Sequence, residues 1–185
     1  MKRSAELITA AKHHFLWSVQ RGNPTYAYLP RHVGEVQKWT LRLLRVHRKA
    51  NRTVALLAVW LHDIGWTVGK IKEDHAIASE RETRRFLARV KVRPETVDRI
   101  AHCVRAHRCR DVQPETIEAK ILAAADSASH MTDIVYIELL SKGLRKYVKE
   151  KLERDYRDVG MFPELQKSLT PLYRAWKTLV RVYPD

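Results

Sequence analysis

The sequence predicts an all-α protein, a single domain over residues 1–185 built as a bundle of about seven to nine helices. Three observations predict this fold. Apolar residues recur every three or four positions along most of the chain, strand-like alternation is almost absent, and Gly and Pro number only six and seven. Because no Gly/Ser-rich or low-complexity linker divides the chain, we expect one domain, with a core at about 26–132 and helices from 133–185 packed on it.

The first four helices each start at a residue that favours a helix N-terminus. Ser, Asn and Asp are good N-caps, and the fixed φ of Pro suits a first turn. The starts are Ser4, Pro30, Asn51 and Asp74, and the predicted helices cover about 4–20, 30–47, 51–61 and 75–90.

Four further helices are predicted in the second half of the chain. Two of them start with Pro at the first helical position and Glu in the first turn, at Pro94 and Pro114. The amphipathic pattern then predicts one long helix over 132–158. After a turn at 160–163, a last helix with regularly spaced apolar residues completes the bundle.

The third predicted helix is apolar on every side from residue 54 to residue 61, so we expect it to run through the middle of the bundle. It ends in adjacent polar residues, His62 and Asp63, and Gly65 then stops the helix. A buried imidazole and carboxylate are costly unless something binds them, and a divalent metal ion commonly does so.

The net charge of +14 is unevenly distributed, because residues 1–60 contain eleven Lys and Arg but only two Glu. Such a charge favours anionic partners, and nucleic acid is one of them. Arg42, Arg45, Lys49 and Arg52 follow one helix face, which a solvated surface explains more simply than a nucleic-acid stripe. We expect a cytoplasmic protein without membrane segments, since the chain has no signal-peptide core and no long apolar run.

Four candidate metal ligands come from three different helices, which a compact bundle can bring to one point. Two nitrogens and two carboxylates suit Mn²⁺, Fe²⁺, Co²⁺, Ni²⁺ or Mg²⁺ rather than a closed zinc site with Cys ligands. Adjacent helical residues diverge by about 100°, so the central pair can share an ion only where the helix ends. The four residues are His32, His62, Asp63 and Asp126.

The order of these four residues, with Leu-His-Asp-Ile-Gly at 61–65 as the central motif, resembles that of the HD-domain superfamily of metal-dependent phosphohydrolases. The similarity runs from about residue 32 to residue 130 and includes segments 74–76, 105–108 and 118–126. The resemblance implies that the four residues named above are metal ligands. It also implies that His75 and His107 either hold a second ion or line the pocket and contact phosphate.

The resemblance further implies hydrolysis of a phosphoester or phosphoanhydride by a water that the metal ion activates. We expect the substrate to be a small phosphorylated compound, most simply a nucleotide, and we identify no general base. Two alternatives stay open, a basic nucleic-acid-binding or regulatory module with a structural metal, and a phosphodiesterase acting on cyclic nucleotides or nucleic-acid ends. A homo-oligomer is compatible with the sequence.

Several residues near the candidate ligands receive secondary roles. His130 lies one helical turn beyond Asp126 and would orient it. His47 competes with His32 as the first histidine ligand, but we interpret it as a core or helix-end residue. The candidate phosphate-binding cations are Lys70, Lys72, Arg105 and Arg108.

Overall fold

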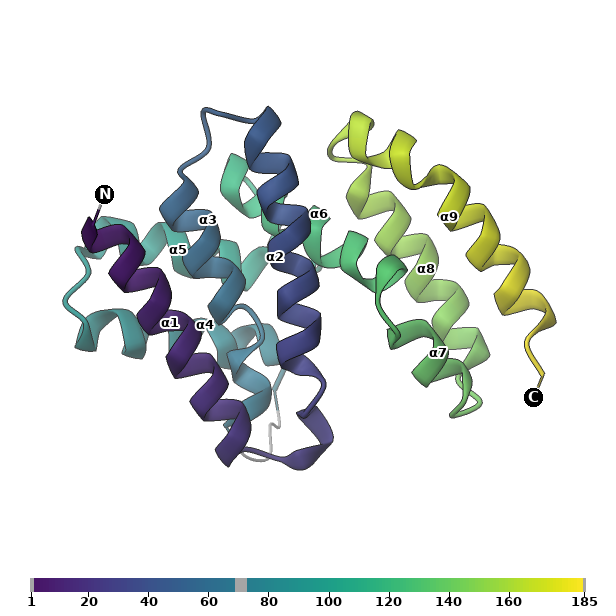
Figure 1. The fold of residues 1–185 in the computed structure, drawn as a ribbon, viewed down its shortest axis with the longest axis horizontal. Helices are drawn as coiled ribbons and strands as arrows, with labels where there is room; N and C mark the ends of the chain where they lie inside the picture. The colour runs from purple at the N-terminus through teal and green to yellow at the C-terminus, as the bar shows by residue number, and fades with distance from the viewer. Residues whose placement is uncertain (1, 69–72, 185) are drawn as a thin grey trace.

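The computed structural model describes residues 2–68 and 73–184, and in these ranges every regular element is a helix. The all-α prediction is therefore confirmed, with nine α-helices and two short 3₁₀ helices (Figure 1). The elements are α1 (Lys2–Arg21), η1 (Pro24–Tyr26), α2 (Leu29–Val46), α3 (Arg52–Leu61), η2 (Ile64–Thr67), α4 (His75–Arg89), α5 (Pro94–Ala106), α6 (Ile117–Thr132), α7 (Val135–Leu140), α8 (Arg145–Val159) and α9 (Pro163–Val182). No helix among the described residues is both long and apolar enough to cross a membrane.

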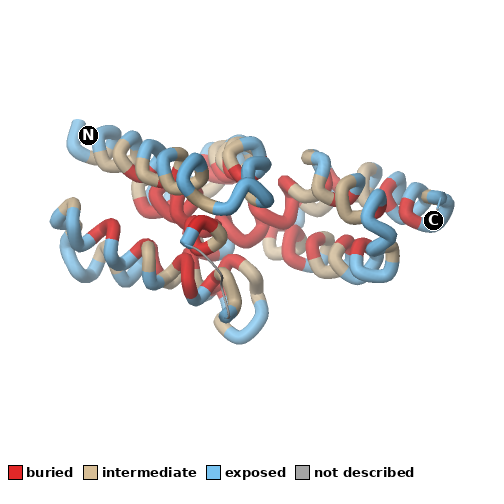
Figure 2. The backbone as a smooth tube through the Cα atoms, turned by 90° about the horizontal axis from the view of Figure 1, so that it is seen from below, coloured by how far each residue is buried: buried red, intermediate tan, exposed pale blue. Residues whose placement is uncertain are grey.

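Helix α3 lies inside the bundle because its sequence offers no polar face. Every residue from Val54 to Leu61 is buried, and the helix packs against α1, α2, α5 and α6. Asn51 caps it as predicted, with its side chain accepting a hydrogen bond from the backbone N–H of Val54 at 3.1 Å. Figure 2 shows the buried backbone concentrated in the interior, with exposed residues on the outer helices.

Two of the predicted helix starts are wrong. The first helix already begins at Lys2, so Ser4 lies within its first turn. The sixth begins at Ile117, because the side chain of Thr116 accepts a hydrogen bond from the N–H of Ala119 and caps the helix there. Pro114 lies outside that helix.

The single long helix predicted over 132–158 is also wrong, since it is two helices, α7 and α8. Gly143 has φ +72°, a left-handed conformation that ends a helix and that glycine adopts at little cost. The backbone N–H groups of Gly143 and Leu144 close the turn onto the carbonyls of Leu140 and Leu139. The two helices that result pack against each other and against α6.

Helix α6 contributes residues to two hydrophobic clusters, and in Figure 1 it connects the helices of the N-terminal part to α7–α9. Ala119, Leu122 and Ala125 belong to the cluster around α3, whereas Ile121 and Ala124 belong to the cluster formed with α7–α9. The small side chains allow close packing on both sides. Asp126, which follows this stretch, is thereby fixed between the two halves of the protein.

Candidate metal centre

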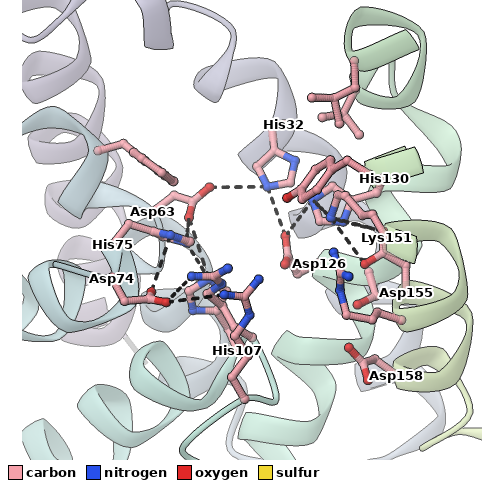
Figure 3. A pocket seen from close by; sticks show the side chains of 18 of the residues that line it. His32, Asp63, Asp74, His75, His107, Asp126, His130, Lys151, Asp155 and Asp158 are labelled. Atoms are coloured by element: carbon pink, nitrogen blue, oxygen red, sulfur yellow. Dashed lines mark hydrogen bonds and ion pairs between the residues drawn. The ribbon is translucent and has the colours of Figure 1, made fainter. Parts of the chain in front are cut away.

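The four residues proposed as ligands from the sequence meet where α2, α3 and α6 converge. His32 lies in the first turns of α2, His62 and Asp63 follow the last residue of α3, and Asp126 lies in the middle of α6. All four are buried, with exposed fractions of 8% or less. Figure 3 shows the side chains of His32, Asp63 and Asp126 pointing toward a common point.

The end of α3 allows two adjacent residues to face the same site. His62 still has helical backbone angles, whereas Asp63 has φ −109° and ψ 9°, outside the helix. Gly65 then lets α4 approach closely, because a Cβ atom there would lie 2.5 Å from the carbonyl oxygen of His75. The backbone N–H of Gly65 donates to Ser79 of α4 at 2.9 Å. Gly65 therefore serves the contact with α4 as well as the end of α3.

The inner group of donor atoms is closely spaced. The Nε2 of His32 lies 3.1 Å from Oδ1 of Asp126 and 3.6 Å from Oδ2 of Asp63. The Nε2 of His62 lies 3.6 Å from the same Asp63 oxygen and 3.7 Å from the same Asp126 oxygen. Each of the two histidine nitrogens thus lies near one oxygen of Asp63 and one oxygen of Asp126. The atoms of His32, His62 and Asp63 form one mutually close group, and those of His32, Asp126 and His130 form another.

A second group of donor atoms uses the other oxygen of Asp63. Its Oδ1 lies 3.3 Å from Nε2 of His75 and 3.8 Å from Nε2 of His107, and the two imidazole nitrogens are 3.2 Å apart. The ring of His75 is stacked on Trp66 at a centroid distance of 4.4 Å, which fixes its plane. The fold therefore brings five of these six His and Asp residues to the lining of one cavity, and His62 lies buried directly behind it.

Hydrogen bonds on the far side of three imidazoles orient their free nitrogens toward the centre. The Nδ1–H of His62 donates to the carbonyl of Val59 at 2.8 Å, and that of His107 donates to Val104 at 2.6 Å. A carbonyl accepts only, so in each neutral ring Nε2 carries the lone pair. Nδ1 of His32 contacts a carboxylate oxygen of Asp133 at 3.3 Å. Metal-binding histidines typically have such partners.

The buried Nε2 of His62 gives a direct test of whether a metal ion fits. Among the described residues it has no hydrogen-bond partner, although its residue is completely buried. An unsatisfied buried acceptor costs about 1–3 kcal/mol. An ion between His62 and the carboxylates of Asp63 and Asp126 would satisfy this nitrogen, so the residues present fit a bound divalent ion.

Electrostatics around the inner group favour positive charge. Burial lowers the pKa of His32, but hydrogen bonds to Asp126 and Asp133 outweigh it and raise this pKa to about 10. Burial raises the pKa of Asp63, but the combined effect of His62, His75 and His32 outweighs it and holds the pKa well below its usual range. The carboxylates therefore stay ionised and attract a cation, whether protons on the imidazoles or a metal ion in their place.

His107 behaves differently from His32. Burial, together with the charges of His62 and His75, lowers the pKa of His107 to about 3. Its ring is therefore neutral at physiological pH, which is the state required of a metal ligand.

The centre opens into a cavity of about 550 Å³. On one side of it lie Asp63, Asp74 and His75, and on the other side lie Lys151 and Asp155 of α8 (Figure 3). Charged residues beside the ends of α3, α4 and α5 thus face those of α8 across the candidate centre.

The structure places the candidate phosphate-binding cations in different surroundings. Arg108 lines the cavity and is hydrogen-bonded to Asp74, which also caps α4. Arg105 is not among the described residues that line the cavity, and its guanidinium is bound by Asp111, so the geometry gives no support to its predicted role as a phosphate contact. Lys70 and Lys72 lie outside the described residues.

Two further histidines have clear structural contacts. His130 stacks on His32 at a centroid distance of 5.2 Å, and its Nε2 lies 3.7 Å from Asp126. His47 ends α2 and contacts Glu164 of α9 at 2.8 Å, far along its helix from His32. The structure therefore places His130 beside the candidate centre and His47 at a contact between helices.

Sequence reasoning missed the contribution of α8 to the cavity. The missed residues lie at i, i+3, i+4 and i+7 on one helix face, a spacing that usually indicates a solvated surface. The signal that could have identified them is a carboxylate, Asp155, close to the apolar stripe of Val148, Leu152 and Val159. The four residues of this face are Lys151, Arg154, Asp155 and Asp158.

Comparison with known proteins agrees with this geometry. The family model described as HD domain matches residues 30–131, from the start of α2 to the end of α6, which is more than half of the chain. No curated protein and no solved structure matches. The matched segment contains all six of the His and Asp residues described above. The chain belongs to the HD-domain family, whose members are generally metal-dependent phosphohydrolases.

Proposed function

We propose that this protein is a metal-dependent phosphohydrolase with a two-ion centre built around Asp63. The proposal rests on the position of the Asp63 carboxylate, whose two oxygens face different imidazoles. Oδ2 faces Nε2 of His32 and of His62 at 3.6 Å each, whereas Oδ1 faces Nε2 of His75 at 3.3 Å. A carboxylate between two groups of imidazole nitrogens can bridge two divalent ions.

The proposed ligands divide into two sets that share one residue. Nitrogen and oxygen ligands about 2.0–2.2 Å from one ion lie roughly 3.0–3.6 Å from each other. Three of the four His–Asp donor distances of the inner group, 3.1, 3.6 and 3.6 Å, fall in that range, and the fourth is 3.7 Å. The first proposed set is the close group of His32, His62 and Asp63 together with Asp126, which lies near both histidines. The second is Asp63, His75 and His107.

The ligand chemistry limits the identity of the ions. Imidazole and carboxylate donors without thiolates suit Mn²⁺, Fe²⁺, Co²⁺, Ni²⁺ or Mg²⁺. When bound, such ions supply polarisation of a phosphoryl oxygen and an acidified water. The chain itself orients the imidazoles, through Asp133 and the carbonyls of Val59 and Val104. Arg108 and Lys151 provide positive charge for the phosphate of the substrate.

The cavity supports a small phosphorylated substrate. Its volume of about 550 Å³ falls in the range of pockets for small molecules. Aromatic side chains of Tyr28 and Trp66 line it beside the candidate centre. An aromatic surface next to a phosphate site suits a nucleotide, and this is the substrate class that we propose.

The first experiment is a metal analysis of the purified protein, followed by hydrolysis assays. The substrates are nucleoside mono-, di- and triphosphates, cyclic nucleotides and phosphodiester dyes, each with Mn²⁺, Ni²⁺ and Co²⁺. We expect retained divalent metal and phosphate release from at least one nucleotide. Absence of turnover on the whole panel by metal-loaded protein would contradict the proposed activity.

Variants of the proposed ligands test the centre itself. We expect His62→Ala and Asp63→Ala to lose bound metal and to lower kcat/KM more than about 100-fold, beyond the effect of removing an outer hydrogen-bond partner. His107→Ala should keep one ion of two, because only the second ligand set loses a donor. His13→Ala, which replaces an exposed histidine of α1, is the matched control and should change neither the bound metal nor kcat/KM.

Circular dichroism checks the helical content of each variant. Full metal content in a His62/Asp63 double variant would disprove the assignment.

A further inference from the structure

The far wall of the cavity comes from helices outside the segment that matches the HD-domain family. Val135 and Leu139 of α7, with Tyr147 of α8, line this wall together with cationic residues. Figure 3 shows the α8 residues across the cavity from Asp63 and His75. This wall is therefore placed to contact the part of a substrate that extends away from the proposed ions.

Most cations that line the cavity are already paired with carboxylates. Arg108 is hydrogen-bonded to Asp74, and Arg110 lies 3.9 Å from the same carboxylate. Lys151 lies 3.2 Å from Asp155. The positive charge of these three side chains is thus partly neutralised within the protein.

Among the described cations that line the cavity, Arg154 is the exception. No carboxylate of residues 2–68 or 73–184 lies within 4.0 Å of its guanidinium, and Asp158 one turn later is bound by Arg157 at 3.0 Å. Arg154 is half-buried, and its guanidinium carbon lies 5.7 Å from the ring centroid of Tyr147. A ring face holds a guanidinium by cation–π attraction while leaving its N–H donors free.

We propose that Arg154, positioned by Tyr147, binds a second phosphate group of the substrate, so that the substrate is a small compound with at least two phosphate groups. This inference rests on the proposed function, because the first phosphate is the one at the metal centre. The planar guanidinium matches phosphate geometry with two parallel hydrogen bonds. The apolar side chains of Val135 and Leu139 on the same wall suit the organic body between the two phosphates.

The test compares ligands that differ by one phosphate. Binding of adenosine 5′-monophosphate, adenosine 5′-diphosphate and adenosine 3′,5′-bisphosphate to the metal-loaded protein is measured by tryptophan fluorescence within the first second after mixing, before product accumulates. Trp66 lines the cavity and reports occupancy. We expect one of the two doubly phosphorylated ligands to bind wild type at least about tenfold more tightly than the monophosphate. Equal affinities for all three would overturn the inference.

The decisive variant is Arg154→Gln, with Lys149→Gln as its matched control. Lys149 is an exposed residue of the same helix that does not line the cavity, and its replacement removes the same charge. We expect Arg154→Gln to abolish the preference for the second phosphate and Lys149→Gln to preserve it. If both variants reduce the preference equally, the overall positive field causes it and Arg154 does not bind phosphate.

Tyr147 variants test the positioning role. Tyr147→Phe keeps the ring face and should keep the preference, whereas Tyr147→Ala should lose most of it without changing affinity for the monophosphate. Identical behaviour of the two variants would contradict the role of the ring.

These binding results are distinguishable from a failure of the proposed function. A protein that hydrolyses nucleotides but shows no preference for the second phosphate would retain the function and refute the inference. A protein that shows the Arg154-dependent preference without turnover would support the inference and refute the proposed function.

Discussion

His62 shows at the scale of one residue how the fold keeps a metal-binding group ready. Its Nδ1–H is fixed by Val59, while its Nε2 is buried and has no partner among the described residues. Such a nitrogen costs about 1–3 kcal/mol unless a ligand satisfies it. Asp63 complements it, because its two oxygens face different imidazoles. These two adjacent residues thus carry most of the proposed chemistry.

Asp158 is a second residue whose buried position destabilises the folded protein when its carboxyl group is charged. Burial raises the pKa of its carboxyl to about 6, although the neighbouring Arg157 opposes the shift, and Asp155 and Asp126 add to it. Between pH 4 and pH 6 the folded protein therefore binds more protons than the unfolded chain, so this group makes stability fall as pH rises through that window. Above pH 6 the carboxyl group is charged, and the full loss of stability from burying that charge is present.

We expect Asp158→Asn to raise the melting temperature of chelator-treated protein by about 2 °C or more at pH 8, because the amide is never charged. The gain should shrink as the pH is lowered to 5, since wild-type Asp158 becomes protonated there. Differential scanning calorimetry at both pH values measures the difference. A gain that stays constant or increases toward pH 5 would show that the charge of Asp158 is not its cause.

At the scale of elements, two helix ends differ in how well their residues suit a left-handed backbone. Lys91 follows α4 with φ +54°, and Gly143 follows α7 with φ +72°. The N–H of Val92 bonds to the carbonyl of Leu87 at 3.0 Å, which closes the end of α4. Only glycine adopts this conformation without strain, so Lys91 is a destabilising choice and Gly143 a favourable one.

We therefore expect Lys91→Gly to increase the free energy of unfolding by about 1 kcal/mol and Gly143→Ala to decrease it by about the same amount. A Cβ atom at Gly143 would meet no atom within 4 Å, so the loss there is purely conformational. Urea denaturation of both variants measures the two changes. Changes of the same sign would contradict the backbone explanation.

At the scale of the whole molecule, α6 belongs to both hydrophobic clusters. Residues of α2 and α3 also reach the second cluster, through Leu43 and Ala55 among others. Because the clusters share these helices, we propose that residues 1–185 unfold as one domain.

This proposal predicts one cooperative unfolding transition. In Trp176→Phe, which removes a tryptophan of the second cluster, the remaining four tryptophans all lie within residues 17–66, while far-UV circular dichroism reports all helices. We expect urea unfolding of this variant to have the same midpoint with both probes. Two separate midpoints would indicate that the C-terminal helices form an independent unit.

Much of the local structure could be predicted because it depends on neighbouring residues. Asn51 and Asp74 cap their helices as expected, since a cap needs only its own side chain and the next turn. The division at Gly143 was missed because the apolar period continues across it. The pairing of Arg105 with Asp111 could not be predicted, because proximity in sequence to His107 does not determine which carboxylate a long side chain contacts.

The sequence alone determined the all-α class, the helix ends at Asn51 and Asp74, and the polar pair that closes the apolar α3, because these depend on composition and local periodicity. Only the tertiary structure decided that Asp63 faces two groups of histidines and that Arg154 completes the cavity from α8. The reason is physical. Contacts between residues far apart in the chain depend on how helices pack, and helix packing is set by the summed burial of many side chains rather than by any local pattern.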